Sequence, residues 1–313
     1  MQVLGTERPH GFFDPDLAPV ATVEPGETVR FATLESGWSP EPFELTDLAG
    51  RRRHAAWTPE SGHALTGPVA VREARAGQVL RIRIEAVEPA GWGTTFANAR
   101  PTPFNERYGL TGSAVHRWIL DPVAGTGRNQ HGHTVALRPF LGVIGMPPAE
   151  PGRHSTIPPR PHGGNLDCRE LVAGSTLWLP IPVDGALLSV GDGHAAQGDG
   201  EVSGTAIECP MDRVDLTLST VDDFPVAGPV ARTPAGWVTM GLGDTVDDAV
   251  FAALNAMFDL LGRLHGVSPA GRGRAGERGG GRAGDPDRQP GRRRARGAAA
   301  RRPPLRTPGR QQA

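Results

Sequence analysis

The stretch that covers residues 61–89 reads SGHALTGPVAVREARAGQVLRIRIEAVEP. After a turn at Ala76-Gly77, the residues alternate between two sets. One set is Val79, Arg81, Arg83 and Glu85, and the other is Leu80, Ile82, Ile84 and Ala86. A period of two residues is typical of a β-strand with one face in the core and one in water. The segment 19–34, PVATVEPGETVRFATL, repeats this design around a Pro-Gly-Glu turn. The two segments predict antiparallel β-structure.

Most of the remaining chain also predicts short strands, at 115–120, 134–137, 176–179, 186–190, 204–208 and 214–218. Residues 91–113 lack periodicity and carry aromatics beside Gly and Pro, so we expect a long loop there, lying over a site. One helix is expected at about 245–264, where Thr245 and Asp248 form an N-terminal cap. Its apolar face, expected to pack on the sheet, comprises Val246, Val250, Leu254, Met257 and Leu261. The predicted fold class is mainly β, with antiparallel sheets forming a sandwich or barrel-like core and this packing helix.

The composition excludes several classes of protein. All 33 basic residues are arginine, so a lysine base, a Schiff base and pyridoxal phosphate chemistry are excluded. No apolar run approaches the roughly 18 residues of a membrane span, and the first residues, MQVLGTERPHGFFDPD, lack a signal-peptide pattern. We therefore expect no membrane partner, a cytoplasmic location, and two thiols, Cys168 and Cys209, rather than a disulfide.

The sequence changes character at about residue 268. Residues 268–313 contain 13 Arg against three acidic residues and almost no large apolar side chain, so this tail is expected to be disordered. One interpretation is a basic arm that touches nucleic acid or anionic surfaces. The preferred hypothesis is an out-of-frame translation of GC-rich DNA, so nucleic acid is not the expected partner. The predicted organisation is a domain at 1–267 and a tail at 268–313.

Residues 161–209 hold two polar clusters, HGGNLD and GDGHAAQGDGE, joined by apolar, strand-like sequence. Their ligand-type side chains are His162, Asn165, Asp167, Asp192, His194, Gln197, Asp199 and Glu201. Asp192 and His194 are two residues apart and would face the same side of a regular strand, where Asp167 or His162 could complete a set of metal ligands. Zn²⁺ is the expected ion, with Ca²⁺ as the alternative.

A metal held in this way would polarise an amide carbonyl and lower the pKa of its bound water. Glu201 or Asp199 is then the candidate general base, and Asn165 or Gln197 the group that orients the substrate amide. The competing interpretation is structural, because Gly-Asp-Gly sequences are common in turns. It leads to a non-catalytic β-module that binds a small molecule or an ion. His131 and His133 could be ligands or belong to a loop, and His63 is expected to be structural.

The strings PFLGVIGMPPAEPG, GGNLD and SVGDGHAAQGDGEVSGTAIE resemble the acetamidase/formamidase family, and the resemblance covers about residues 20–265. It implies a mostly β fold, a small amide substrate such as formamide or acetamide, a divalent metal and a homo-oligomer. The family's motif positions fall on Asn165, Asp167, Asp192, His194, Gln197 and Glu201. Glu150, in the PPAEPG segment, is a second candidate for the catalytic carboxylate.

Overall fold

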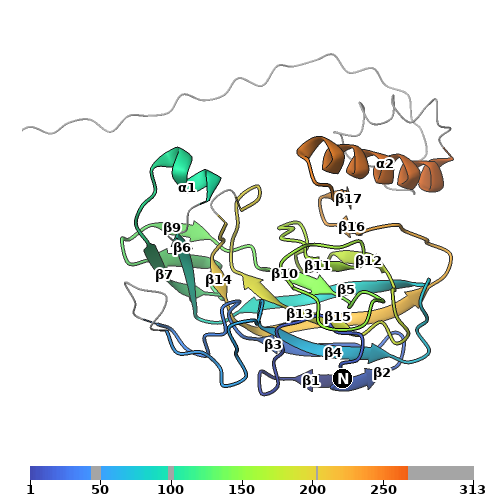
Figure 1. The fold of residues 1–313 in the computed structure, drawn as a ribbon, viewed down its shortest axis with the longest axis horizontal. Coiled ribbons are helices and arrows are strands. Elements are labelled where there is room, and N and C mark those ends of the chain that lie inside the picture. Colours follow the sequence, from blue (N-terminus) through green and yellow to red (C-terminus); the bar gives the residue numbers. More distant parts are fainter. Residues whose placement is uncertain (44–50, 98–101, 202–203, 267–313) are drawn as a thin grey trace, which may run out of the picture.

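The computed structural model describes residues 1–43, 51–97, 102–201 and 204–266. The predicted disordered tail at 268–313 lies outside the described residues. Within them, the chain forms two β-sheets and two helices (Figure 1). The prediction of a mainly β fold is confirmed.

The first sheet has seven described strands, in the order β1 (Gln2–Leu4), β3 (Thr28–Thr33), β15 (Met211–Val221), β5 (Val79–Pro89), β12 (Thr176–Pro180), β16 (Val230–Thr233) and β17 (Gly236–Thr239). Its neighbours are antiparallel except for β1 and β3. On β5, Leu80, Ile82 and Ile84 are buried while Arg81, Arg83 and Glu85 are exposed. The alternation in the sequence thus correctly identified a strand with one wet face.

The second sheet has ten described strands and carries the candidate site. Its main path is β11 (Gly163–Asn165), β10 (Phe140–Gly145), β13 (Leu188–His194), β14 (Glu208–Cys209), β6 (Trp92–Ala97), β7 (Ala114–Asp121), β8 (Thr126–Asn129) and β9 (Thr134–Ala136). β4 (Leu65–Val71) pairs with β13, and β2 (Ala21–Val23) pairs in parallel with β4. One continuous apolar cluster includes Phe31 and Ile82 of the first sheet and Leu141 and Val190 of the second, so the core joins the two sheets.

Two local expectations are wrong. The predicted loop at 91–113 contains β6 and a short helix, α1 (Pro103–Tyr108). β6 forms because it pairs with β7 in antiparallel fashion, a non-local contact that its irregular composition does not indicate. Of the predicted strand at 204–208, only Glu208 lies in a strand, as the first residue of the two-residue β14, which forms a short bridge between β13 and β6.

The C-terminal helix α2 (Val246–His265) forms where predicted, with Thr245 as N-cap and Gly266 as C-cap. The expected packing face is wrong. Val246, Val250 and Leu254 are 79%, 48% and 43% exposed, whereas Leu260 is the buried residue of this helix. Small residues decide the orientation. The Thr239 hydroxyl donates to the Ala253 carbonyl at 2.8 Å, and the Gly241 backbone lies directly against Ala249.

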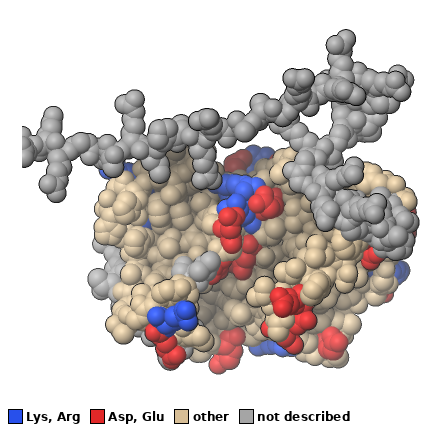
Figure 2. Space-filling model, turned by 90° about the horizontal axis from the view of Figure 1, so that it is seen from above, with Lys and Arg blue, Asp and Glu red and all other residues tan. Residues whose placement is uncertain are grey.

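No helix among the described residues is both long and apolar enough to cross a membrane. Figure 2 shows acidic side chains together with arginine near the middle of the face that is seen from above. A chain of ion pairs links Arg138 to Glu170, Glu170 to Arg169, and Arg169 to Asp199. These pairs connect the segment that follows Asp167 with the loop that carries Glu201.

Candidate active site

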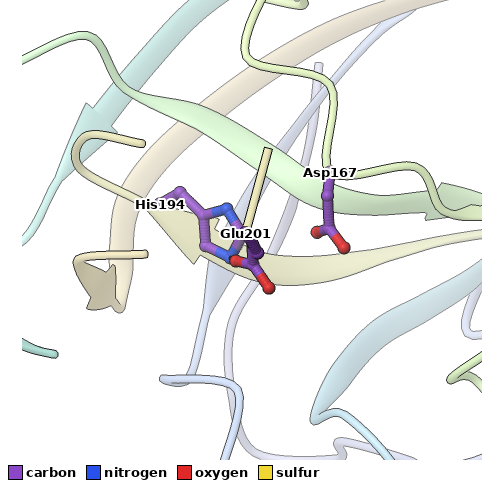
Figure 3. A group of neighbouring side chains, drawn as sticks. All are labelled: Asp167, His194 and Glu201. Carbon is purple, nitrogen blue, oxygen red and sulfur yellow. The ribbon is translucent and has the colours of Figure 1, made fainter. Parts of the chain in front are cut away.

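The candidate site lies where β13 meets β10 and β14. Asp192 and His194 stand on β13, so the Gly-Asp-Gly sequence that could have been a turn is part of a fully buried strand. Glu208 opens β14 and is the antiparallel partner of His194. Asp167 comes from the segment between β11 and β12, and Glu201 from the loop between β13 and β14. Figure 3 shows how Asp167, His194 and Glu201 lie relative to one another.

Three carboxylates surround one nitrogen of His194. The Nε2 atom lies 3.2 Å from Glu208 Oε2, 3.4 Å from Asp192 Oδ1 and 3.6 Å from Glu201 Oε1. His194 is only 1% exposed, and Asp192 and Glu208 are also buried. Nε2 of His194, Oδ1 of Asp167 and Oε1 of Glu201 are buried and have no hydrogen-bond partner among the described residues. Buried polar atoms normally have hydrogen-bond partners, so these side chains are typical of a site that binds a cation.

Two overlapping sets of side chains could hold a metal ion. Asp192, His194 and Glu208 form one set, and Asp167, His194 and Glu201 form the other. In each set the ligand atoms all lie within 4.8 Å of one another. Imidazole nitrogen with carboxylate oxygen suits Zn²⁺, and the oxygens alone suit harder cations such as Ca²⁺. The residues present therefore fit a divalent metal.

The backbone is strained at the two aspartates. Asp167 has φ 44° and Asp192 has φ 55°, both in the left-handed region that non-glycine residues rarely adopt. On the neighbouring strand β10, the residue that faces the two aspartates is a glycine. A Cβ on Gly142 of β10 would lie 2.7 Å from Asp167 Oδ1 and closer still to Asp192 Oδ2. Gly142 thus permits the close approach of the two carboxyl groups.

Protein groups hold the ligand side chains in place. The Ser36 hydroxyl donates to Glu208 Oε2 at 3.2 Å, and the Ala206 N–H donates to Glu208 Oε1 at 3.1 Å. Gln197 bonds both the His194 ring and the Asp167 carbonyl. These contacts hold the Glu208 carboxylate and the His194 imidazole in place before any ligand binds.

The electrostatics of the site separate its titratable groups. Burial raises the pKa of Glu201 to about 8, helped by the charges of Glu208 and Asp167. Burial and the neighbouring Asp192 raise the pKa of Asp167 to about 6. Burial alone would lower the pKa of His194, but the charges of Glu208 and Asp192 raise it well above its usual value.

The pKa of Asp192 shifts in the opposite direction to those of Asp167 and Glu201. Burial alone would raise its pKa, yet His194 and His63 hold the pKa below its usual value. At neutral pH Asp192 is therefore ionised, whereas Glu201 holds a proton. Strongly perturbed groups that share one buried cluster are typical of a functional site.

Comparison with known proteins identifies the family. The profile of the acetamidase/formamidase family matches residues 5–153 and 150–230, which together are more than half of the chain. The chain belongs to the acetamidase/formamidase family.

Relatives within the family agree with this assignment. The chain is 27% identical over 250 residues to a formamidase of Methylophilus methylotrophus, covering 62% of this chain and 59% of the relative. It is 26% identical over 309 residues to an acetamidase of Mycolicibacterium smegmatis, covering 77% and 75%. The structure of an acetamidase from Bacillus halodurans aligns with a TM-score of 0.74 at 28% identity, covering 83% of this chain and 84% of that one. The chain thus spans less than two thirds of the length of the formamidase.

The structure brings together most of the side chains that the acetamidase/formamidase resemblance indicated. Asp167, Asp192, His194 and Glu201 converge, and Gln197 contacts two of them. Asn165 lies on β11 and is half-buried, and its buried Oδ1 has no hydrogen-bond partner in the part of the chain that the structure describes. Asp199 is exposed and paired with Arg169.

Two candidates lie apart from these ligand groups. The His162 ring nitrogen Nδ1 bonds the Met146 carbonyl at 2.8 Å. Glu150 is exposed, and its carbonyl accepts a hydrogen bond from His154. Neither side chain belongs to a set of converging metal ligands among the described residues.

Sequence reasoning missed two members of the site. Glu208 is the one charged residue in the string GTAIEC, and that isolation was the available signal. His63, expected to be structural, bonds Thr156 and lies close enough to lower the pKa of both Asp167 and Asp192. The string GHALTGP around it gives no sign of this proximity.

Proposed function

We propose that this protein hydrolyses short linear amides, such as formamide and acetamide, to ammonia and a carboxylate. The observation that carries the proposal is the buried His194, whose Nε2 faces three carboxylates in a chain of the acetamidase/formamidase family. We assign Asp192, His194 and Glu208 as ligands of a divalent metal, with Asp167 beside them, and Zn²⁺ as the expected ion. When bound, such a metal polarises a carbonyl and lowers the pKa of water.

The chain's own residues handle the proton and orient the substrate. With its pKa raised to about 8, Glu201 holds a proton at neutral pH and can donate it to the nitrogen that leaves as ammonia. Asp167, with a pKa of about 6, is mostly ionised at pH 7 and can accept a proton from the attacking water. The unsatisfied Oδ1 of Asn165 can accept a hydrogen bond from the N–H of the amide.

The test is ammonia release from a panel of linear amides, paired with metal analysis of the same preparation. Formamide and acetamide should be turned over, and both a chelator and Asp192→Ala should abolish turnover. Asp184→Ala, at an exposed carboxylate paired with Arg75, is the matched control and should behave as wild type. Full activity in a metal-free preparation would refute the metal assignment and leave amide hydrolysis standing.

The non-catalytic β-module makes a different prediction in the same experiment. A protein that only binds an ion would lose thermal stability with chelator and release no ammonia from any amide. Homo-oligomeric assembly and a cytoplasmic location also stay predictions, and the domain boundary at residue 267 is a further one.

A further inference from the structure

The Gln197 side chain lies between two parts of the site. It follows β13 by three residues, is half-buried, and makes two hydrogen bonds through its carboxamide. One joins Oε1 to Nδ1 of His194 at 2.9 Å, and the other runs from Nε2 to the backbone carbonyl of Asp167 at 2.8 Å. Both ends of the amide are therefore engaged by protein groups.

These two partners fix the orientation of the amide. The Asp167 carbonyl can only accept a hydrogen bond, so the NH₂ group of Gln197 must point toward it. That leaves Oε1 facing His194, and because Oε1 carries no proton, Nδ1 of the ring must be the donor. The structure therefore assigns a proton to Nδ1 of His194 without reference to any metal.

A proton on Nδ1 determines what the other ring nitrogen can do. In a neutral imidazole with Nδ1–H, the lone pair is on Nε2, the atom that faces Glu208 and Asp192. Histidines that bind metals generally donate their second ring N–H to a fixed acceptor in this way. The second bond of Gln197 restrains Asp167 at the position where its backbone has φ 44°.

We infer that Gln197 is a positioning residue, which holds His194 in the Nδ1–H form and Asp167 in its strained conformation, and does not bind the substrate amide. The expected effect on metal binding rests on the proposed metal-dependent function, whereas the two hydrogen bonds of Gln197 do not depend on it. It replaces the substrate-binding role that the sequence suggested for Gln197. One side chain would thus align ligand groups from two segments that are far apart in the chain.

Two substitutions separate the two hydrogen bonds. Gln197→Met keeps the length of the side chain and removes both bonds. Gln197→Glu keeps an acceptor for Nδ1–H and removes the donor to Asp167. The matched control is Gln130→Met. Gln130 follows β8 and also bridges two backbone groups, because it accepts from the Arg117 N–H and donates to the Val115 carbonyl of β7.

The first measurement is NMR of the His194 ring in the metal-free, full-length protein. Wild type and Gln197→Glu should show an Nδ1–H that is protected from exchange, and in Gln197→Met this proton should lose its protection. The second is Zn²⁺ affinity by chelator competition, which should fall about 10- to 100-fold in Gln197→Met and less in Gln197→Glu. Gln130→Met should leave both readouts unchanged.

Distinct results would overturn the inference. Unchanged Zn²⁺ affinity and an unchanged Nδ1–H signal in Gln197→Met would refute the positioning role. A raised KM for formamide with unchanged Zn²⁺ affinity would instead restore the substrate-binding role. If wild type binds no Zn²⁺ or hydrolyses no amide, the proposed function fails, and the NMR experiment still decides whether Gln197 positions His194.

Discussion

Replacing Gly142 by alanine should disable the site while leaving the fold intact. Gly142 lies in the middle of β10, opposite the two strained aspartates, and its φ is not in the left-handed region, so alanine can adopt its backbone conformation. The added methyl group would meet Asp167 Oδ1 at 2.7 Å and press even harder on Asp192 Oδ2. The change therefore acts on the two carboxylates rather than on the strand.

The size of the displacement follows from the contact distances. Ordinary van der Waals contact of a Cβ begins at 3.4 Å, so Asp167 Oδ1 must retreat by at least 0.7 Å and Asp192 by more. A misplacement of about 1 Å in an active site can reduce the rate about 100-fold. Overpacking of a core typically costs about 1–3 kcal/mol of stability. We expect Gly142→Ala to lose at least about 100-fold in kcat/KM for formamide and to stay folded.

The assay is ammonia release with parallel Zn²⁺ affinity and thermal unfolding. Gly91→Ala is the control, because the nearest described atom to a Cβ there is the Leu120 carbonyl oxygen, at 3.9 Å. The control should match wild type in all three measurements. Wild-type turnover and Zn²⁺ affinity in Gly142→Ala would refute the claim that this glycine sets the positions of the two aspartates.

Three further predictions concern charges. Glu208→Gln should lower Zn²⁺ affinity at least about tenfold, which chelator competition measures. It should also lower the pKa of His194, because Glu208 is the nearest charge that raises this pKa, and an NMR titration measures that change. Asp215→Asn should destabilise the protein by about 1–2 kcal/mol at pH 7, because Arg30 and Arg213 hold the pKa of Asp215 at about 2. The two arginine side chains are 33% and 38% exposed, so solvent screening keeps the energy in this range. A carboxyl group whose pKa is depressed in the folded protein stabilises the fold at pH values above its pKa in the unfolded chain, which is near 4. The difference in unfolding free energy between wild type and Asp215→Asn should therefore shrink as the pH falls from about 4 to 2, and denaturant melts measure it. Metal removal should lower the melting temperature, by an amount equivalent to about 2.7 kcal/mol when free Zn²⁺ is 100 times its Kd.

Sequence patterns predicted the elements that touch water on one side. β5 was predictable because its buried and exposed residues alternate. β13 is buried on both faces. Its first residues fall in the predicted strand at 186–190, but neither periodicity nor composition separates its GDGH end from a turn. The caps of α2 are local and were predictable, but its packing face depends on Gly241 and Thr239 of the neighbouring segment.

The site was predictable to the extent that its ligands are close in sequence. Asp192 and His194 are two residues apart on one strand, and their motif indicated a shared face. Glu208 joins them through strand pairing, and Gly142 through the opposite strand, so no spacing along the chain signals either residue. The role of Gln197 depends on which atoms its amide meets, which a motif does not encode.

The way α2 is attached affects how the molecule opens. Ala249 and Ala253 of the helix lie against Gly241 and Thr239, and Leu260 is the one buried side chain of the helix. Regions with few buried apolar contacts open locally, at a free energy well below that of global unfolding. β5 and β15 lie inside the first sheet and are paired on both sides, so their amides exchange with solvent only when the whole domain unfolds. α2 can therefore detach and reattach as a separate cooperative unit while β13 and β14, which carry the metal ligands, stay folded.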